Sequence, residues 1–235
     1  MPISLEHFNF GDIANPETGD PMFKYWLKKE FEEWGQYEKF FEVKKGDIVL
    51  DLGASIGPFL YSIKKRNPSK VIAVEPFTYY QPLLIENSEG LPITIVQKAL
   101  GDKDNEIINL KWSALEEEVE TITFKSLIEQ YDIEQIDFLK TDCEGGEYLV
   151  FTEENFDWIR KNTKQIVGEW HLGSYDLKTK FKQFRNLYLK NLKYTATSIE
   201  GNNISSDIWD DNFLENYTEI IIYIFNNHPE NLKHE

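Results

Sequence analysis

Short apolar runs alternate with amphipathic segments along most of the chain. Five runs have the length and β-branched composition of buried strands, and they cover residues 48–50, 71–75, 93–96, 136–142 and 165–171. Helical patterns follow several of them, ending near residue 66 and covering 78–88 and 124–131. Strands that alternate with helices in this way predict a parallel sheet joined by right-handed crossovers.

Two other regions depart from this alternation. After a helix expected over about 177–190, the apolar runs 194–199 and 219–225 lack a comparable crossover helix between them, so we expect an antiparallel pair. Earlier in the chain, apolar residues at 107, 108 and 110 suit an added edge strand. The acidic run 116–120 is expected to be a solvated loop.

The first 44 residues begin as an irregular arm and continue as a helix predicted over about 22–42, with a break near Gly35 as one alternative. We expect this helix to pack against the edge of the sheet. A lid over the site, built from Tyr25, Trp26 or Tyr37, is the alternative. The chain is therefore divided into an arm and helix, 1–44, and a main domain, 45–235.

Composition narrows the classes of partner. With 41% hydrophobic residues among 235, the chain can bury one sizeable core. A net charge of −16 disfavours nucleic acids and anionic membranes as partners. No apolar run approaches a membrane span, and the first residues do not resemble a signal peptide. The single cysteine, Cys143, excludes a disulfide framework and fits a reducing, cytoplasmic setting.

The densest motif runs from Val49 to Gly57 and reads VLDLGASIG. It predicts a buried strand, a glycine turn and the first turn of a helix, whose free N–H groups face the turn. A dinucleotide site needs G-x-G-x-x-G, but Ser55 replaces the middle glycine and Asp51 precedes the turn. An acid there disfavours a pyrophosphate and suits a ligand with a cationic amino-acid end. The D-x-G-x-x-x-G pattern resembles the S-adenosylmethionine site of class I methyltransferases.

Polar residues end four of the predicted strands: Asp51, Glu75, Asp142 and Glu169 with His171. Ligands of open parallel sheets bind beyond the carboxyl ends of the strands, so these side chains should meet in one crevice. Glu75 is placed to accept hydrogen bonds from both hydroxyls of a ribose. NAD sites use an acid at this place as well, so Glu75 indicates a ribose without identifying the cofactor.

A second cluster, Asp142, Glu144 and Glu147, surrounds the Gly145-Gly146 turn. Three acids this close raise one another's pKa unless they share a cation. Lys140, a sulfonium on the substrate or a divalent metal would each meet that need.

These motifs resemble the FkbM family of S-adenosylmethionine-dependent methyltransferases. The resemblance rests on DLGASIG, VIAVEP, ALGD, TITFKSLIEQYDIEQIDFLKTDCEGGE and IVGEWH, in this order, within residues 45–175. It implies an α/β, Rossmann-like class I methyltransferase fold. That fold has a seven-stranded, mostly parallel sheet with an antiparallel last strand and helices on both faces. It also implies O-methylation of a hydroxyl on a small molecule, polyketide or sugar.

The resemblance also implies site residues. By position, Asp51, Gly53 and Gly57 hold the methionine end of S-adenosylmethionine, Glu75 holds the ribose, and Ala99 and Leu100 lie near the adenine. The neighbouring Ala54, Ser55 and Pro76 complete the expected cofactor-binding set, and Asp142 lines the reaction site as well.

Methyl transfer to an alcohol is an in-line displacement that also requires loss of a proton. His171 is the candidate general base because its ordinary pKa lies near working pH. A structural histidine beside Trp170 is the alternative, and Asp142 is placed to act instead or to orient the hydroxyl. A Mg²⁺ held by Asp142, Glu169 or His171 is a further alternative that we do not favour.

Two rival functions stay open at this point. One is a non-catalytic protein that binds the cofactor or a partner, and the other is an NAD-dependent oxidoreductase, which Asp51 and Ser55 disfavour. The sequence predicts neither the acceptor nor the oligomeric state.

Overall fold

The computed structural model describes residues 4–11, 22–112 and 115–226. Its main feature is a seven-stranded sheet in the order β3-β2-β1-β7-β8-β10-β9. In that order the strands are Ile93–Val96, Lys70–Val74, Ile48–Leu52, Ile136–Thr141, Thr163–His171, Glu219–Phe225 and Tyr194–Thr197.

Five of these strands are parallel neighbours, and only β10 runs against its neighbours β8 and β9. This confirms the mostly parallel sheet and the late antiparallel pair. The chain winds outward from β1 through β2 to β3 and then returns to β7 on the other side of β1. The strand order therefore reverses between β1 and β7, where a ligand crevice is expected in such sheets.

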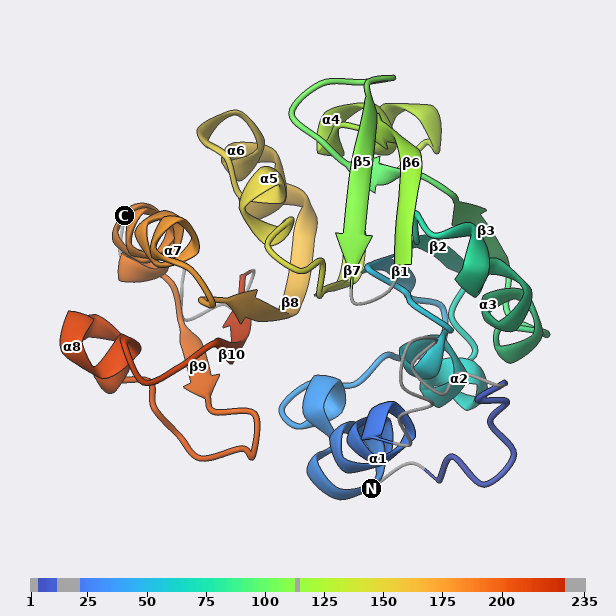
Figure 1. Cartoon of the computed structure of the whole chain (residues 1–235), viewed down its shortest axis with the longest axis horizontal. Coiled ribbons are helices and arrows are strands. Elements are labelled where there is room, and N and C mark those ends of the chain that lie inside the picture. The colour runs from blue at the N-terminus through green and yellow to red at the C-terminus, as the bar shows by residue number, and fades with distance from the viewer. Residues whose placement is uncertain (1–3, 12–21, 113–114, 227–235) are drawn as a thin grey trace.

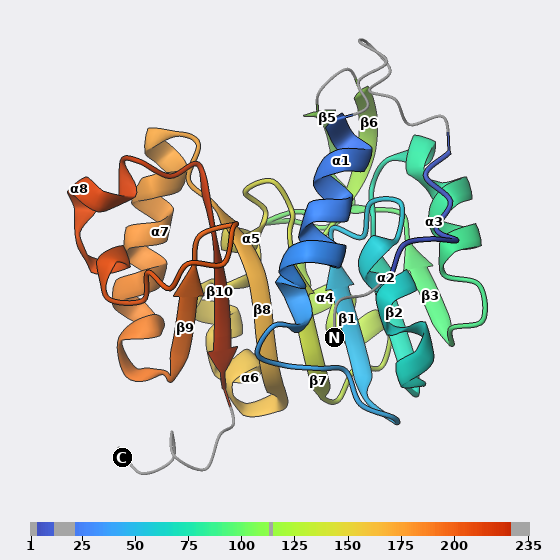
Figure 2. The same ribbon diagram turned by 90° about the horizontal axis from the view of Figure 1, so that it is seen from below.

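Helices cover both faces of the sheet (Figures 1 and 2), as the sequence predicted. One face carries α1, α2 and α3, and the other carries α4, α5, α6 and α7. A short α8 lies beyond β9 and β10 in Figure 1. In chain order these helices are Met22–Lys28, Pro58–Ile63, Gln81–Asn87, Phe124–Gln130, Glu147–Val150, Glu153–Asn162, Tyr175–Leu187 and Asp211–Leu214. Within the described residues, no helix is long and apolar enough to cross a membrane.

Each face of the sheet has its own hydrophobic core. Val49 and Val71 face the core under α2 and α3, whereas Leu50 and Ile72 face the core under α4 and α7. All four side chains are fully buried. Burial on both faces explains why these strands appear in the sequence as continuous apolar runs.

A second, three-stranded sheet has the order β4-β6-β5, from Ala99–Leu100, Leu115–Ile122 and Ile107–Trp112. Strand β5 confirms the expected edge strand. The expectation of a loop at residues 116–120 was wrong, because they belong to β6 and pair antiparallel with β5. Their acidic side chains are tolerated because the hairpin is exposed and gives them partners, such as Lys98 for Glu120 and Asn109 for Glu116.

The helix predicted over about 22–42 is broken at Gly35, which confirms the alternative that the sequence offered. After α1 the chain forms a π-helical stretch, Lys29–Trp34, and Gly35 then adopts a left-handed conformation with φ of 58°. A short 3₁₀ turn, Gln36–Glu38, follows. Leu27 and Phe31 are buried in the core of the face that carries α1, α2 and α3. The segment therefore packs on a face of the sheet and not on its edge, which β3 and β9 form. Parts of the predicted arm, 1–3 and 12–21, and the end of the predicted main domain, 227–235, lie outside the described residues.

Candidate active site

The glycine turn after β1 ties three central strands together. The N–H groups of Gly53 and Ala54 both donate to the Val74 carbonyl at the end of β2, at 3.0 Å. Gly53 has a φ of 80°, and a Cβ there would lie 1.7 Å from the Asp142 carbonyl oxygen after β7. Only glycine allows this approach, so the turn is fixed at the point where the strand order reverses.

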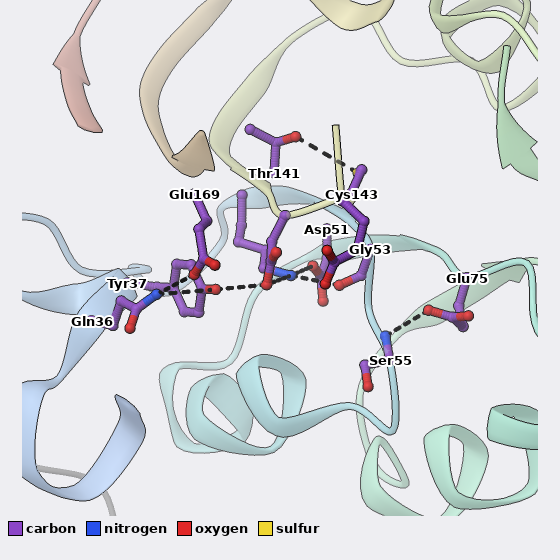
Figure 3. Close-up of polar contacts among 12 residues, drawn as sticks. Gln36, Tyr37, Asp51, Gly53, Ser55, Glu75, Thr141, Cys143 and Glu169 are labelled. Atoms are coloured by element: carbon purple, nitrogen blue, oxygen red, sulfur yellow. Dashed lines mark hydrogen bonds and ion pairs between the residues drawn. The ribbon is translucent and has the colours of Figure 1, made fainter. Parts of the chain in front are cut away.

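Glu75 follows β2 and is held by the backbone on two sides. Its Oε2 accepts from the N–H of Ser55 at 2.8 Å (Figure 3). Its Oε1 accepts from the N–H of Phe77 at 2.9 Å. Burial raises the pKa of this carboxyl to about 7, even though both hydrogen bonds favour the ionised form. The carboxylate is therefore fixed in place before any ligand arrives.

Asp51 and Lys140 are direct neighbours on β1 and β7 and form a buried ion pair of 3.2 Å. Lys140 also donates to the Gly53 carbonyl and lies 3.7 Å from Asp142. Burial acts to lower the pKa of Lys140, but the charges of Asp51 and Asp142 outweigh it and raise the pKa. Asp51 thus supports the turn through Lys140, beneath the surface that a ligand would touch.

The turn after β7 is organised around Glu147, which is fully buried. Its Oε1 accepts from the N–H of Cys143 at 2.7 Å and lies 3.1 Å from Nδ1 of His171. The other ring nitrogen of His171 lies 3.3 Å from Glu144 and 3.5 Å from Glu169. Burial acts to lower the pKa of His171, but Glu147, and after it Asp142 and Glu144, raise the pKa to about 10.

Two residues of the N-terminal segment also contact Glu169 and Asp142, although they lie far from them in the sequence. Gln36 donates from Nε2 to Oε2 of Glu169, and the Tyr37 hydroxyl donates to Oδ2 of Asp142, each at 2.8 Å (Figure 3). Tyr223 of β10 donates its hydroxyl to the Gln36 carbonyl and so holds this segment. Burial and the charge of Asp142 raise the pKa of Tyr37 well above its usual range.

Most of these groups line one cavity of about 1080 Å³. The predicted site residues that line it are Gly53, Ala54, Ser55, Glu75, Pro76, Ala99, Leu100, Asp142 and His171. Asp51 and Gly57 do not line it: Asp51 faces Lys140, and a Cβ on Gly57 would meet Leu84 of α3 at 3.1 Å. The ligand atoms of Asp142, Glu169 and His171 lie within 4.8 Å of one another, the arrangement needed to hold a metal ion.

Sequence reasoning missed much of the cavity wall. Glu30 and Trp34 line it from the N-terminal segment, and Leu110 and Trp112 line it from β5. Trp112 donates to Glu144 at 2.9 Å. The apolar faces of the helix and hairpin signalled burial but not what they would face, because each looks like ordinary core packing in the sequence. Of the three residues proposed for a lid, Trp26 and Tyr37 line the cavity and Tyr25 does not.

Comparison with known families decides between the candidate classes. The sequence model of the methyltransferase FkbM domain matches residues 51–196, more than half of the chain. The chain belongs to the FkbM methyltransferase family. This S-adenosylmethionine-dependent family was the resemblance found in the sequence motifs. No curated protein sequence matches the chain significantly.

Solved structures agree on the fold. A fibrillarin/Nop5p complex matches with 13% identity and a TM-score of 0.50, covering 83% of this chain and 84% of that one. Aeropyrum pernix fibrillarin with natively bound S-adenosyl-L-methionine matches with 13% identity and a TM-score of 0.47, covering 81% of this chain and 72% of that one. Precorrin-6y C5,15-methyltransferase from Geobacter metallireducens matches with 12% identity and a TM-score of 0.47, covering 94% of this chain and 95% of that one. At 13% identity the likeness to the fibrillarin/Nop5p complex extends to the fold alone, and the observed sheet agrees with the Rossmann-like methyltransferase fold expected for an FkbM protein.

Proposed function

We propose that this FkbM protein transfers a methyl group from S-adenosylmethionine to a hydroxyl oxygen of a small molecule or sugar. The observation that carries the cofactor assignment is Glu75, a fixed carboxylate at the end of β2 that faces the cavity beside the glycine turn. In the proposal Glu75 accepts hydrogen bonds from the ribose hydroxyls, and the turn at Gly53–Ser55 carries the methionine end. Asp51 contributes by holding Lys140 beneath that turn.

The reaction needs alignment, exclusion of water and loss of the acceptor's proton. Asp142 and His171 line the same part of the cavity, where the acceptor hydroxyl is proposed to lie. The surroundings of His171 favour the imidazolium, with a pKa of about 10, so it must lose a proton before it acts as a base. Asp142, whose carboxylate is oriented by Tyr37, is the second candidate for taking or directing the hydroxyl proton.

The acid-rich surface supports a small acceptor rather than RNA. Fibrillarin and the rRNA methylase from Streptococcus thermophilus share the fold and are named for RNA substrates or processing. This chain has a net charge of −16, which repels a phosphate backbone. The N-terminal helix and β5 also bring Trp26, Trp34 and Trp112 to the cavity, which suit stacking on a sugar or planar ring.

Calorimetry with three ligands tests the proposal. S-adenosylmethionine and its demethylated product should bind, and NAD should not. Transfer of a labelled methyl group should then be measured across a panel of sugars, phenols and polyketide alcohols. Binding of NAD in place of S-adenosylmethionine would favour an oxidoreductase. Transfer to an amine but not to any hydroxyl would refute the O-methylation.

A further inference from the structure

We propose that Asp142, Glu169 and His171 form a binding site for a divalent cation, with Mn²⁺ or Mg²⁺ as the ion that suits it best. Asp142 follows β7, and Glu169 and His171 end β8, so the three side chains come from adjacent strands. Their candidate ligand atoms all lie within 4.8 Å of one another. Bonds of about 2.1 Å to a common ion need only small rotations from that arrangement.

His171 is aimed into this cluster from a buried position. Its side chain is 10% exposed, and its Nδ1 lies 3.1 Å from the fully buried Glu147. A carboxylate at Nδ1 fixes the ring and its tautomer and leaves Nε2 for the ion. Among the described residues Nε2 makes no hydrogen bond, although carboxylate oxygens lie nearby at 3.3 and 3.5 Å.

Each carboxylate in the cluster also has an outer partner. Tyr37 donates to Oδ2 of Asp142 and Gln36 donates to Oε2 of Glu169 (Figure 3). These donors occupy one oxygen of each carboxylate and leave the other for coordination. An outer partner on every ligand is typical of built metal sites, and a chance meeting of surface acids lacks it.

Two charged side chains beside the cluster, Lys140 and Glu144, bear on cation binding in opposite ways. Lys140 lies 3.7 Å from Asp142, but its shorter contacts are to Asp51 and the Gly53 carbonyl. Glu144 lies 3.3 Å from His171, and its side chain is 57% exposed on the turn. Trp112 holds its Oε1 at 2.9 Å, and its Oε2 faces His171, so Glu144 is placed to become a fourth ligand. Glu30 and Glu219 line the same cavity without belonging to the cluster.

One nitrogen and two carboxylates leave positions open on a six-coordinate ion. An acceptor hydroxyl could occupy one of them, and this role of the ion rests on the proposed function. With an ion bound, Asp142 and His171 would be ligands and not bases, so the acceptor O–H would coordinate the ion and release its proton to solvent water as it enters the site. The oxygen lone pair would then form the bond to the methyl carbon as the carbon–sulfur bond breaks, with that electron pair remaining on sulfur. Coordination favours the step by stabilising the alkoxide.

The test measures the ion alone. Mn²⁺ titrated into metal-stripped protein should lose its free six-line electron paramagnetic resonance signal, with a Kd tighter than about 1 mM. Glu169→Gln should weaken binding roughly 100-fold, and Glu219→Gln less than about threefold. This pair is matched because each variant removes one carboxylate from the same cavity. Circular dichroism should show that both variants are folded.

No bound Mn²⁺ at 1 mM, or equal weakening by the two variants, would overturn the site and indicate only diffuse attraction to acids. Asp142→Asn supplies a second variant if Glu169→Gln does not fold. Calorimetry with S-adenosylmethionine on the same samples separates the two proposals. Cofactor binding without Mn²⁺ binding removes the cation site alone, whereas Mn²⁺ binding without cofactor binding removes the cofactor assignment alone.

Discussion

The two halves of the cavity are built in different ways. On the side of β1 and β2, backbone N–H groups hold the ligand-facing carboxylate of Glu75, and strand neighbours fix Asp51 against Lys140. On the side of β7 and β8, carboxylates gather around His171 with side chains from the distant N-terminal segment. One half rests on main-chain geometry and the other on side chains brought together by tertiary packing.

This difference matches what each half must do. The glycine turn and the carboxylates around His171 both lie inside the matched family region, 51–196. Gln36 and Tyr37, which contact Glu169 and Asp142, lie before that region. Changes in the first half should therefore be costly, whereas changes in the second should be better tolerated.

The largest effect is expected from Gly53→Ala. The added Cβ would lie 1.7 Å from a backbone oxygen that cannot move away without separating β1 from β7. We expect a loss of more than about 4 kcal/mol in the free energy of unfolding, measured with urea. Gly46→Ala is the matched control, because Gly46 also has a positive φ, of 90°, but a Cβ added there would meet no atom within 4 Å. It should cost only about 1 kcal/mol, and equal costs would show that the close approach is absent.

The next effect concerns Glu75. Glu75→Ala should weaken S-adenosylmethionine binding by about 2–3 kcal/mol, or about 30- to 150-fold, because two hydrogen bonds to a charged group are lost. In the unaltered protein, affinity should fall as the pH drops below about 7, where the carboxyl becomes protonated. Calorimetry from pH 5.5 to 8.5 measures both effects. A variant with unchanged affinity would remove the ribose assignment.

The smallest effect is expected from Glu30→Gln on the acceptor side. Burial, and after it the charge of Asp142, raises the pKa of Glu30 to about 8. A folded-state pKa above the unfolded value means stability that is present below about pH 4.5 and lost as the pH rises through 8. With a metal chelator present, the free energy of unfolding of Glu30→Gln should therefore exceed that of the unaltered protein by about 1–2 kcal/mol at pH 8.5. Near pH 4.5 the two free energies should be equal.

Glu33→Gln serves as the control for this last experiment, because Glu33 is exposed on the same helix and paired with Lys29. If both variants change the pH dependence of urea unfolding equally, the effect belongs to the charge of the helix and not to the cavity.

The parallel sheet could be predicted because burial on both faces leaves continuous apolar runs such as that of β2. The β5–β6 hairpin could be predicted only in part, because exposed glutamates on β6 suggest a loop until their cross-strand partners are known. The parallel pairing likewise follows from the alternation of strands and helices, whereas the π-helical stretch after α1 leaves no comparable pattern.

The site could be predicted where topology alone brings residues together. Glu75, Asp142 and His171 end strands of one sheet, so their meeting followed from the fold. Asp51 was correctly placed at a strand end, but the sequence did not reveal that its register with Lys140 turns it away from the cavity. The contribution of Gln36 was not found, because a polar residue after Gly35 carries no sign of the distant Glu169 that it contacts.

The contact between Tyr223 and Gln36 has a consequence for synthesis on the ribosome. The strands that fix the glycine turn, β1, β2 and β7, are complete once residue 141 has emerged. The segment that orients Asp142 and Glu169 is anchored by β10, which emerges only after β8 and β9. A nascent chain would thus be able to form the turn around Glu75 before it gains the contacts that orient Asp142 and Glu169.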